Sequence, residues 1–485
     1  MKLTILGGGG FRVPLVYRAL LGDRGEGRVT QVTLHDLDSG RLSAIGQVLA
    51  EQADEAAGIG GAAGAGGPGD DAGPRSAAGP GRTAGPRGAT GPSGPDAPEV
   101  TVTTDLDTAL KGADFVFSAI RVGGLEGRAA DERTALAEGV LGQETVGAGG
   151  VAYGLRTVPV ATRIARRIAE LAPDAWVINF TNPAGLVTEA MSRVLGDRVI
   201  GICDSPVGLG RRVARALGAD PDRAWIDYVG LNHLGWLRGL RIDGRDELPR
   251  LLADSDALTS FEEGRLFGAE WLRSLGAIPN EYLHYYYFTR EAVEAARAAE
   301  RTRGAFLRDQ QGHFYERMEH GGEPALRAWD RTRAEREATY MAENREAAGI
   351  GERDACDLES GGYEQVALAL MRAIAGNERT TLILNVRNGT TLPVLDADAV
   401  IEVPCSVDAD GAHPLSVSPL PLHATGLVCA VKAVEREVMA AAEGHSYAAA
   451  VGAFALHPLV DSAHVARRLL DAYRAEHPGL AYLRP

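Results

Sequence analysis

A run of glycines near the N-terminus has the residue types and the setting of a phosphate-binding loop. The run consists of Gly7, Gly8, Gly9, Gly10 and Phe11. It follows a short apolar segment and precedes a helical pattern, so backbone N–H groups could approach a pyrophosphate at a helix N-terminus. The G-x-G-x-x-G fingerprint is incomplete, because its third glycine would fall on Arg12. A tight turn without a ligand is the alternative.

An acidic residue strengthens the nucleotide interpretation. Asp36 ends the second apolar run, residues 32–36, and follows Gly9 by 27 residues. This separation is somewhat larger than the roughly 20 residues usual in a dinucleotide-binding unit. The Asp36 carboxylate would accept hydrogen bonds from the ribose hydroxyls, which favours NAD over its phosphorylated relative. The alternative is an ordinary surface acid at the end of a strand.

Composition limits the classes of partner. The chain has 485 residues, 45% of them hydrophobic, and a net charge of −15. This length favours two or more domains, and the negative charge argues against a nucleic-acid-binding surface. We expect a small-molecule partner, a homo-oligomer, and no membrane or nucleic-acid partner. An anionic ligand would need arginines in a cleft to outweigh the overall field.

The cysteines and the N-terminus indicate a cytoplasmic protein. The four cysteines are far apart and lack the paired spacing of a disulfide or zinc framework. The apolar segment at residues 3–6 is too short for a signal peptide, and no apolar run reaches transmembrane length. We therefore expect reduced thiols in the cytoplasm.

The first part of the chain alternates between strand and helix patterns. Strands are predicted at residues 3–6, 32–36, 115–120 and 176–180, and a helix at 13–21. Such alternation predicts a parallel sheet. We predict an α/β fold whose residues 1–199 form a Rossmann-like NAD-binding domain. Residues 58–98 are rich in Gly, Pro and Ala and are predicted to be a disordered insertion within it.

The second part has a mixed pattern. Helical stretches are predicted around 290–345, 363–376 and 425–443, with strands at 381–386 and 400–404. We predict that residues 200–485 form an α+β domain that carries the substrate and metal sites and packs over the mouth of the first domain.

A series of short motifs covers most of the chain outside the insertion. They are IRVGG at 120–124, GQET at 142–145, NFTNPAG at 179–185, CDSP at 203–206, GLNH at 230–233, PNEYL at 279–283 and VIEVPC at 400–405. In order and content they resemble glycoside hydrolase family 4. The resemblance implies hydrolysis of phosphorylated glycosides with NAD and a divalent metal, an exception among glycosidases that otherwise use two carboxylates.

The resemblance implies a metal site. Cys203 and His233, 30 residues apart, would bind a divalent ion, usually Mn²⁺, completed by substrate oxygens and water. A thiolate is a soft donor for this hard ion, so the affinity should be modest. From the residues alone, a lone cysteine and a lone histidine are more often structural.

The resemblance also implies the catalytic groups. Tyr282 would be the base, although a phenol has an ordinary pKa of about 10 and needs a nearby cation or metal to act near neutrality. Glu144 would assist it; a buried acid paired with an arginine is the alternative. Asp204 would be the general acid, or would only cap or orient its loop.

Three further residues match substrate contacts of the family. Arg128 and Arg303 would bind the 6-phosphate through their planar donor groups, and Asn182 would bind sugar hydroxyls. Arg303 lies among several arginines, and a solvated surface charge is its alternative. An arginine in such a helix is usually a solvated surface charge.

The implied reaction begins with oxidation of the 3-hydroxyl by NAD. Proton removal at C2, elimination at C1, water addition and return of the hydride follow, without net NADH. We predict a 6-phospho-β-glucosidase, because residues 179–185 and 423–427 resemble the β-directed branch. Asp204, directly after Cys203, resembles the α-directed branch and favours a 6-phospho-α-glucosidase instead. An NAD-dependent hydroxy-acid dehydrogenase is the alternative from another class, and it would release NADH.

Overall fold

The computed structural model describes residues 1–62, 97–339 and 362–484. The predicted insertion at 58–98 therefore lies mostly outside the described residues. Its predicted start is corrected, because helix α2 (Ser39–Ala62) continues past Gly58. Ala53, Ala56 and Ala57, which precede Gly58 in α2, are strong helix formers, and the helix continues from them through the glycines that follow. Among the described residues, no helix has the length and apolar character needed to cross a membrane.

One large sheet forms the centre of the molecule, and half of it is parallel. The strand order is β10-β8-β7-β12-β11-β6-β5-β4-β1-β2-β3. The parallel strands are β1 (Lys2–Leu6), β2 (Gln31–His35), β3 (Glu99–Thr103), β4 (Phe115–Ser118), β5 (Trp176–Asn179) and β6 (Val199–Gly201). This confirms the α/β fold class. Since β1 lies between β2 and β4, the strand order reverses direction at the glycine loop, where such sheets bind ligands.

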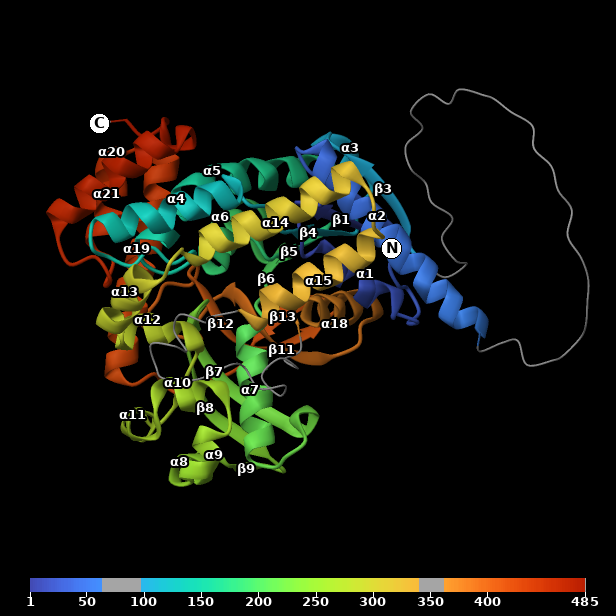
Figure 1. The fold of residues 1–485 in the computed structure, drawn as a ribbon. Helices are drawn as coiled ribbons and strands as arrows, with labels where there is room; N and C mark the ends of the chain where they lie inside the picture. The colour runs from blue at the N-terminus through green and yellow to red at the C-terminus, as the bar shows by residue number, and fades with distance from the viewer. Residues whose placement is uncertain (63–96, 340–361, 485) are drawn as a thin grey trace, which may run out of the picture.

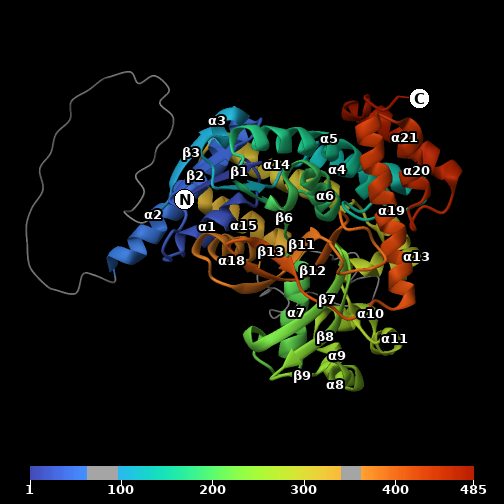
Figure 2. The ribbon, with the colours of Figure 1, turned by 180° about the vertical axis from the view of Figure 1, so that it is seen from behind.

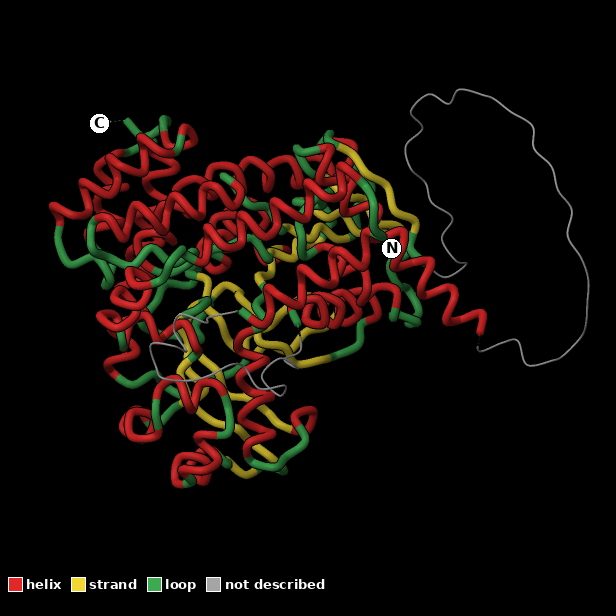
Figure 3. Tube along the Cα trace, in the orientation of Figure 1, coloured by secondary structure: helices red, strands yellow, loops and turns green. Residues whose placement is uncertain are grey.

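Apolar residues of the parallel strands alternate between two cores. In β1, Leu3 and Ile5 belong to the core beneath α1 (Val13–Leu21) and α2, while Leu6 belongs to the core on the other face. That second core includes residues of α5 (Gly147–Leu171) and α6 (Ala184–Leu195). Successive strand side chains point to opposite faces, so strands covered on both sides are apolar throughout. Figure 3 shows the helices on either side of the strands.

The second part of the chain extends the same sheet with antiparallel strands. These are β7 (Ala224–Leu231), β8 (Leu234–Ile242), β10 (Ile278–Pro279), β11 (Thr380–Arg387) and β12 (Val400–Asp408), with β9 (Arg245–Asp246) and β13 (Gly411–Pro414) at the margins. β6 pairs with β11 through Gly201 and Asn385. The predicted boundary at residue 199 thus falls inside β6, and both predicted domains share one sheet. The division into two domains stays a prediction.

Helices of the second part cover both faces of the first. α14 (Arg303–His320), α15 (Ala325–Ala338) and α18 (Tyr363–Gly376) pack against α1 and α2, and α19 (Leu422–Gly444) packs against α5 (Figures 1 and 2). The remaining helices are α3 (Leu106–Leu110), α4 (Gly124–Ala137), α7 (Ser205–Ala216), α8 (Leu248–Ala253), α9 (Ser255–Thr259), α10 (Glu262–Phe267), α11 (Ala269–Leu275), α12 (His284–Tyr287), α13 (Thr289–Ala298), α20 (Tyr447–Ala455) and α21 (Ala463–Glu476).

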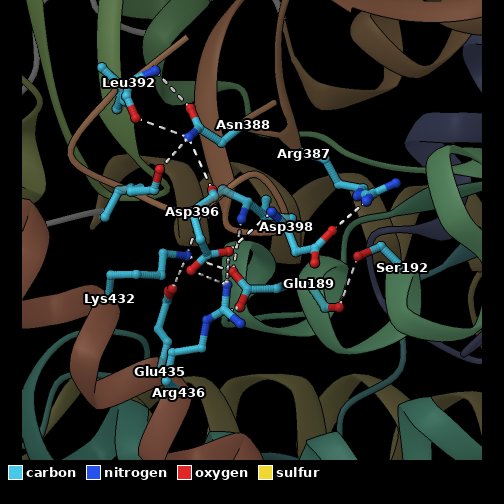
Figure 4. A network of polar contacts seen from close by, with 12 residues as sticks. Glu189, Ser192, Arg387, Asn388, Leu392, Asp396, Asp398, Lys432, Glu435 and Arg436 are labelled. Atoms are coloured by element: carbon cyan, nitrogen blue, oxygen red, sulfur yellow. Dashed lines mark hydrogen bonds and ion pairs between the residues drawn. The ribbon is translucent and has the colours of Figure 1, made fainter. Parts of the chain in front are cut away.

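A buried ion-pair network, the Glu189 cluster, joins α6 to α19. Glu189 is 1% exposed and pairs with Lys432 at 2.8 Å and Arg436 at 2.7 Å. Lys432 also pairs with Glu435, and Arg436 with Asp396 at 2.8 Å (Figure 4). The Glu189 carboxylate also accepts a hydrogen bond from the backbone N–H at the start of β12, at 2.8 Å. Every charge in this network has a partner, so the network holds α6 and α19 against the sheet.

Candidate active site

A cleft of about 660 Å³ lies at the carboxyl ends of the parallel strands. Loops that follow β1, β4, β5 and β6 contribute to it, as do the turn between β7 and β8 and the start of α14. The predicted site residues that line it are Gly7, Gly10, Phe11, Arg128, Glu144, Asn182, Cys203, Asp204, His233, Tyr282 and Arg303. The predicted residues Gly8, Gly9 and Asp36 are not part of its lining. Segments from all along the chain thus meet at one place.

The glycine loop is shaped by packing on its sheet side and is open on its cleft side. Gly7 has a φ of 80°, and a Cβ there would lie 2.5 Å from the Ala119 carbonyl oxygen. A Cβ on Gly8 would lie 2.7 Å from Leu34 Cβ. At Gly10, the nearest obstacle to a Cβ is the carbonyl oxygen of Gly7 at 2.9 Å. Because Gly7 and Gly10 line the cleft, the loop presents bare backbone to a ligand.

Asp36 supports the glycine loop directly. Its carboxylate accepts hydrogen bonds from the backbone N–H of Gly9 at 3.1 Å and of Asp38 at 3.2 Å. It therefore joins the end of β2 to the loop. The predicted contact of Asp36 with a ribose stays a prediction.

Three helices of the second part fix the loop from outside, a feature that sequence reasoning missed. Tyr315 of α14 donates to the Gly9 carbonyl at 2.7 Å, Trp329 of α15 to the Phe11 carbonyl at 2.8 Å, and Tyr363 of α18 to the Arg12 carbonyl at 2.7 Å. The Phe11 ring is buried against Trp329, with centroids 5.9 Å apart. Its backbone is therefore the part of Phe11 that could face a cofactor.

Cys203 and His233 both line the cleft, Cys203 from the end of β6 and His233 from the turn between β7 and β8. Cys203 follows β6 and is 5% exposed; burial, reinforced by the charges of Glu402 and Asp204, raises the pKa of its thiol well above the usual value. His233 is the second residue of the two-residue turn between β7 and β8, where its φ is 61°. A side chain at positive φ is strained, and such strain is concentrated at functional sites. Burial lowers the pKa of His233 to about 4.

Cys203 and His233 offer two possible metal donors in the lining of the cleft. Within residues 1–62, 97–339 and 362–484, no three His, Cys, Asp or Glu side chains are arranged to hold a metal ion by themselves. A thiolate and an imidazole fit a divalent ion whose remaining positions are left for substrate oxygens and water. The predicted ligand roles stay a prediction.

Tyr282 lies in a short 3₁₀ turn, Glu281–Leu283, and stacks on His233. The two ring centroids are 3.7 Å apart, and the planes differ by 3°. The tyrosine therefore stands next to the proposed metal ligand, where a base aided by a cation would have to be. The role of Tyr282 as the base stays a prediction.

Glu144 pairs with two arginines of the cleft wall. Its carboxylate pairs with Arg121 and, at 2.5 Å, with Arg128. Burial alone would raise the pKa of Glu144, but the charges of Arg121 and Arg128 lower it well below the usual range. The arginine-paired acid that the sequence left open as an alternative is thus what the structure contains. An assisting role toward Tyr282 stays a prediction.

Asp204 lines the cleft at the start of α7. It stands at the N-cap of α7, but its side chain makes no capping hydrogen bond. The capping alternative is therefore wrong for its carboxylate, and the general-acid role stays a prediction. Asn182 lies in the loop that follows β5 and also lines the cleft.

Arg303 is anchored at the end of α15. Its guanidinium donates to Thr339 Oγ1 at 2.7 Å and to the Arg336 carbonyl at 2.9 Å. Arg303 also lines the cleft. Its contact with the 6-phosphate stays a prediction.

Arg336 was missed by sequence reasoning. Its guanidinium lies near other cations. Burial and the charges of Arg12, Arg303 and Arg128 therefore lower the pKa of Arg336 to about 9. We call Arg12, Arg128, Arg303 and Arg336 the arginine cluster. Such a concentration of positive charge in a chain of net charge −15 fits an anionic ligand.

Family models and curated relatives match most of this chain. Residues 93–219 match the model of family 4 glycosyl hydrolases, and residues 228–460 match the model of the family 4 C-terminal domain. A probable 6-phospho-β-glucosidase of Bacillus subtilis is 35% identical over 79% of this chain and 83% of its own length. 6-Phospho-α-glucosidase 1 of Lacticaseibacillus paracasei is 30% identical over 77% of this chain and 83% of its length.

A solved structure extends the likeness to the fold. The structure is of a 6-phospho-α-glucosidase from gut microorganisms in complex with NAD and Mn²⁺. It aligns with a TM-score of 0.74 and 25% identity, over 98% of this chain and 97% of that one. The sequence matches and the shared fold lead to one conclusion: this chain is a glycoside hydrolase and belongs to the family 4 glycosyl hydrolases.

Proposed function

We propose that the chain is a 6-phospho-β-glucosidase that uses NAD and a divalent metal ion such as Mn²⁺. The observation that carries this proposal is the meeting of three features in one cleft: the open glycine loop, the Cys203 and His233 donors beside Tyr282, and the arginine cluster. A dehydrogenase needs only the glycine loop and a contact for an anionic substrate. A simple hydrolase needs no nucleotide loop.

The cofactor sites follow from the residues that line the cleft. Gly7 and Gly10 would receive the pyrophosphate of NAD, with Asp36 at the ribose. Cys203 and His233 would hold the metal ion. When bound, these groups supply a hydride acceptor for the sugar 3-hydroxyl and a Lewis acid.

The side chains of this chain carry the remaining steps. Arg128 and Arg303 would hold the 6-phosphate through charge-assisted hydrogen bonds, and Asn182 would orient the sugar hydroxyls. Tyr282 would take the proton from C2, and Asp204 would give a proton to the departing oxygen at C1. Water would then add at C1 and a proton would return to C2, and return of the hydride to C3 would restore the 3-hydroxyl and regenerate NAD, so that the net reaction is hydrolysis.

The β-directed activity is supported by the 35% identity to the probable 6-phospho-β-glucosidase of Bacillus subtilis. Asp204 directly after Cys203 and the 30% identity to 6-phospho-α-glucosidase 1 favour the α-directed alternative. The cytoplasmic localisation of this chain and its homo-oligomeric state stay predictions.

Two assays test the proposal. An aryl 6-phospho-β-glucoside with NAD⁺ and Mn²⁺ should release its aglycone without net NADH, whereas stoichiometric NADH would identify a dehydrogenase. Cellobiose 6′-phosphate and maltose 6′-phosphate are then compared by kcat/KM, because their unactivated leaving groups depend on the acid. We expect at least a tenfold preference for the cellobiose compound, about 1.4 kcal/mol in transition-state binding. A tenfold preference for the maltose compound, lost in Asp204→Asn, would establish the α-directed alternative.

A further inference from the structure

His233 is connected by hydrogen bonds to the N-terminus of α5. Its Nδ1 lies 2.7 Å from Thr145 Oγ1, which lies 3.2 Å from Gln143 Oε1. Gln143 Oε1 also accepts the backbone N–H groups of Thr145 at 2.7 Å and Val146 at 2.9 Å. We call Gln143, Thr145 and His233 the relay. It joins a strained turn to the start of a 25-residue helix.

The positions of the protons in the relay follow from its chemistry. The two backbone N–H groups fix the oxygen end of the Gln143 amide, and an amide oxygen can only accept. The hydroxyl of Thr145 has one proton, which it must donate to Gln143 Oε1; otherwise two oxygen lone pairs would face each other. Thr145 Oγ1 then accepts from His233 Nδ1–H. A neutral imidazole with its proton on Nδ1 has a free electron pair on Nε2.

We propose that Gln143 and Thr145 are positioning residues that hold His233 in the Nδ1–H tautomer, with Nε2 directed to a divalent ion. The inference rests on the proposed metal role of His233. Metal-binding histidines usually donate their second ring N–H to such a partner, which fixes both the tautomer and the ring orientation.

Two further contacts keep the ring from turning. Tyr282 stacks flat against it at 3.7 Å. The preceding residue, Asn232, donates to the buried carboxylate of Glu402 at 3.1 Å, which holds the turn on β12. If the ring rotated by half a turn, a carbon atom would face Thr145 and the hydrogen bond would be lost. The relay therefore selects which nitrogen remains for a ligand, and it also keeps the ring parallel to Tyr282.

The tautomer can be read in the metal-free wild-type protein. Two-bond ¹H–¹⁵N spectra of histidine-labelled protein distinguish Nδ1–H from Nε2–H, and His233→Asn identifies the signal of His233. We expect Nδ1–H at neutral pH. An Nε2–H signal in the wild type overturns the inference, and this measurement needs no folded relay variant.

Metal affinity provides the second readout. The isosteric Thr145→Val removes the hydroxyl, and Thr145→Ser keeps it. We expect Thr145→Val to weaken Mn²⁺ binding, measured by electron paramagnetic resonance of the free ion, by about 10–100-fold. Thr145→Ser should stay within about threefold of the wild type, since Oγ1 is retained. Wild-type affinity in Thr145→Val overturns the relay.

Failure of the relay is distinguishable from failure of the proposed function. If Cys203→Ser binds Mn²⁺ as tightly as the wild type, or the wild type binds none, the proposed metal site is wrong and the relay has no metal to serve. If Cys203→Ser loses affinity while Thr145→Val keeps it, the metal site stands and only the relay is wrong.

Discussion

Two carboxylates of this protein, one buried and one partly buried, each lie between two cations, yet their surroundings differ. Glu189 lies between Lys432 and Arg436, and Glu144 lies between Arg121 and Arg128. Lys432 and Arg436 belong to α19, whereas Arg121 precedes α4 and Arg128 lies within it. From the local arrangement alone, the two sites would be judged equivalent.

The charges around each carboxylate separate the two sites. In the Glu189 cluster, Glu435 and Asp396 balance the same lysine and arginine, so little charge is left over (Figure 4). Around Glu144, the arginine cluster adds further cations, and one of them, Arg336, has its pKa lowered to about 9. Removal of one member of a closed set of buried ion pairs leaves a buried charge uncompensated, whereas a cleft lined by more arginines than carboxylates attracts an anion. The excess of charge indicates function better than any single ion pair.

The largest expected effect of a substitution lies in the cleft. Tyr282→Phe should lower kcat by roughly 10²–10⁴, the usual contribution of a general base, while folding and NAD binding are kept. Steady-state kinetics and fluorescence titration with NAD measure both. Tyr286→Phe, from the same aromatic run but outside the cleft lining, is the matched control. A Tyr282→Phe enzyme with nearly wild-type kcat would remove the base from this site.

The comparison of the two carboxylates predicts opposite responses to cation removal. Lys432→Met should lower the free energy of unfolding by about 3–5 kcal/mol, because Glu189 is left buried with less compensation. Its thermal stabilisation by glucose 6-phosphate should persist. Arg128→Met should lose that stabilisation, because the anion loses its partner in the cleft.

Denaturant unfolding and melting curves with and without glucose 6-phosphate test both variants. Equal stabilisation of Arg128→Met and Lys432→Met by the ligand would contradict the distinction between the two clusters. Loss of ligand stabilisation in both variants would contradict it as well.

The smallest expected effect concerns His457, a buried group for which the described part of the chain supplies no ion pair. The ring nitrogens of His457 lie near two backbone N–H groups, Nε2 at 3.2 Å from that of Gly147 and Nδ1 at 3.1 Å from that of Leu459, and a neutral imidazole accepts a hydrogen bond from one of them. Burial lowers its pKa to about 4. The folded state therefore keeps His457 neutral while the unfolded chain binds a proton, so stability is lost as the pH falls from about 6.5 to about 4.

His457→Gln should make this loss smaller by roughly 3 kcal/mol, since the shift spans about two and a half pKa units. Urea unfolding at pH 7, 5.5 and 4 measures it. His464→Gln, at an exposed imidazole, is the control. An unchanged pH dependence in His457→Gln would mean that His457 is protonated in the folded protein.

Local patterns in the sequence determined many of the elements. The predicted helix at 13–21 is α1 with the same bounds, and the predicted strands at 381–386 and 400–404 lie within β11 and β12. The predicted stretch around 290–345 corresponds to α13, α14 and α15 over its described residues. Periodicity reports which face of a segment is buried, and this depends on neighbouring residues. The glycine loop, the motifs and the family matches together predicted fourteen site residues, and eleven of them line one cleft.

Only the tertiary structure decided how distant side chains pair. Trp329 donates to the Phe11 carbonyl across 318 residues of sequence, and Thr145 meets His233 across 88. It also decided that Glu144 is clamped by two arginines and that Asp204 does not cap α7. No local pattern encodes these contacts, because a hydrogen bond or ion pair depends on where two segments come to lie after the sheet and its helices have packed. The sequence determines which elements form and which residue types are present, and packing decides which of those residues meet.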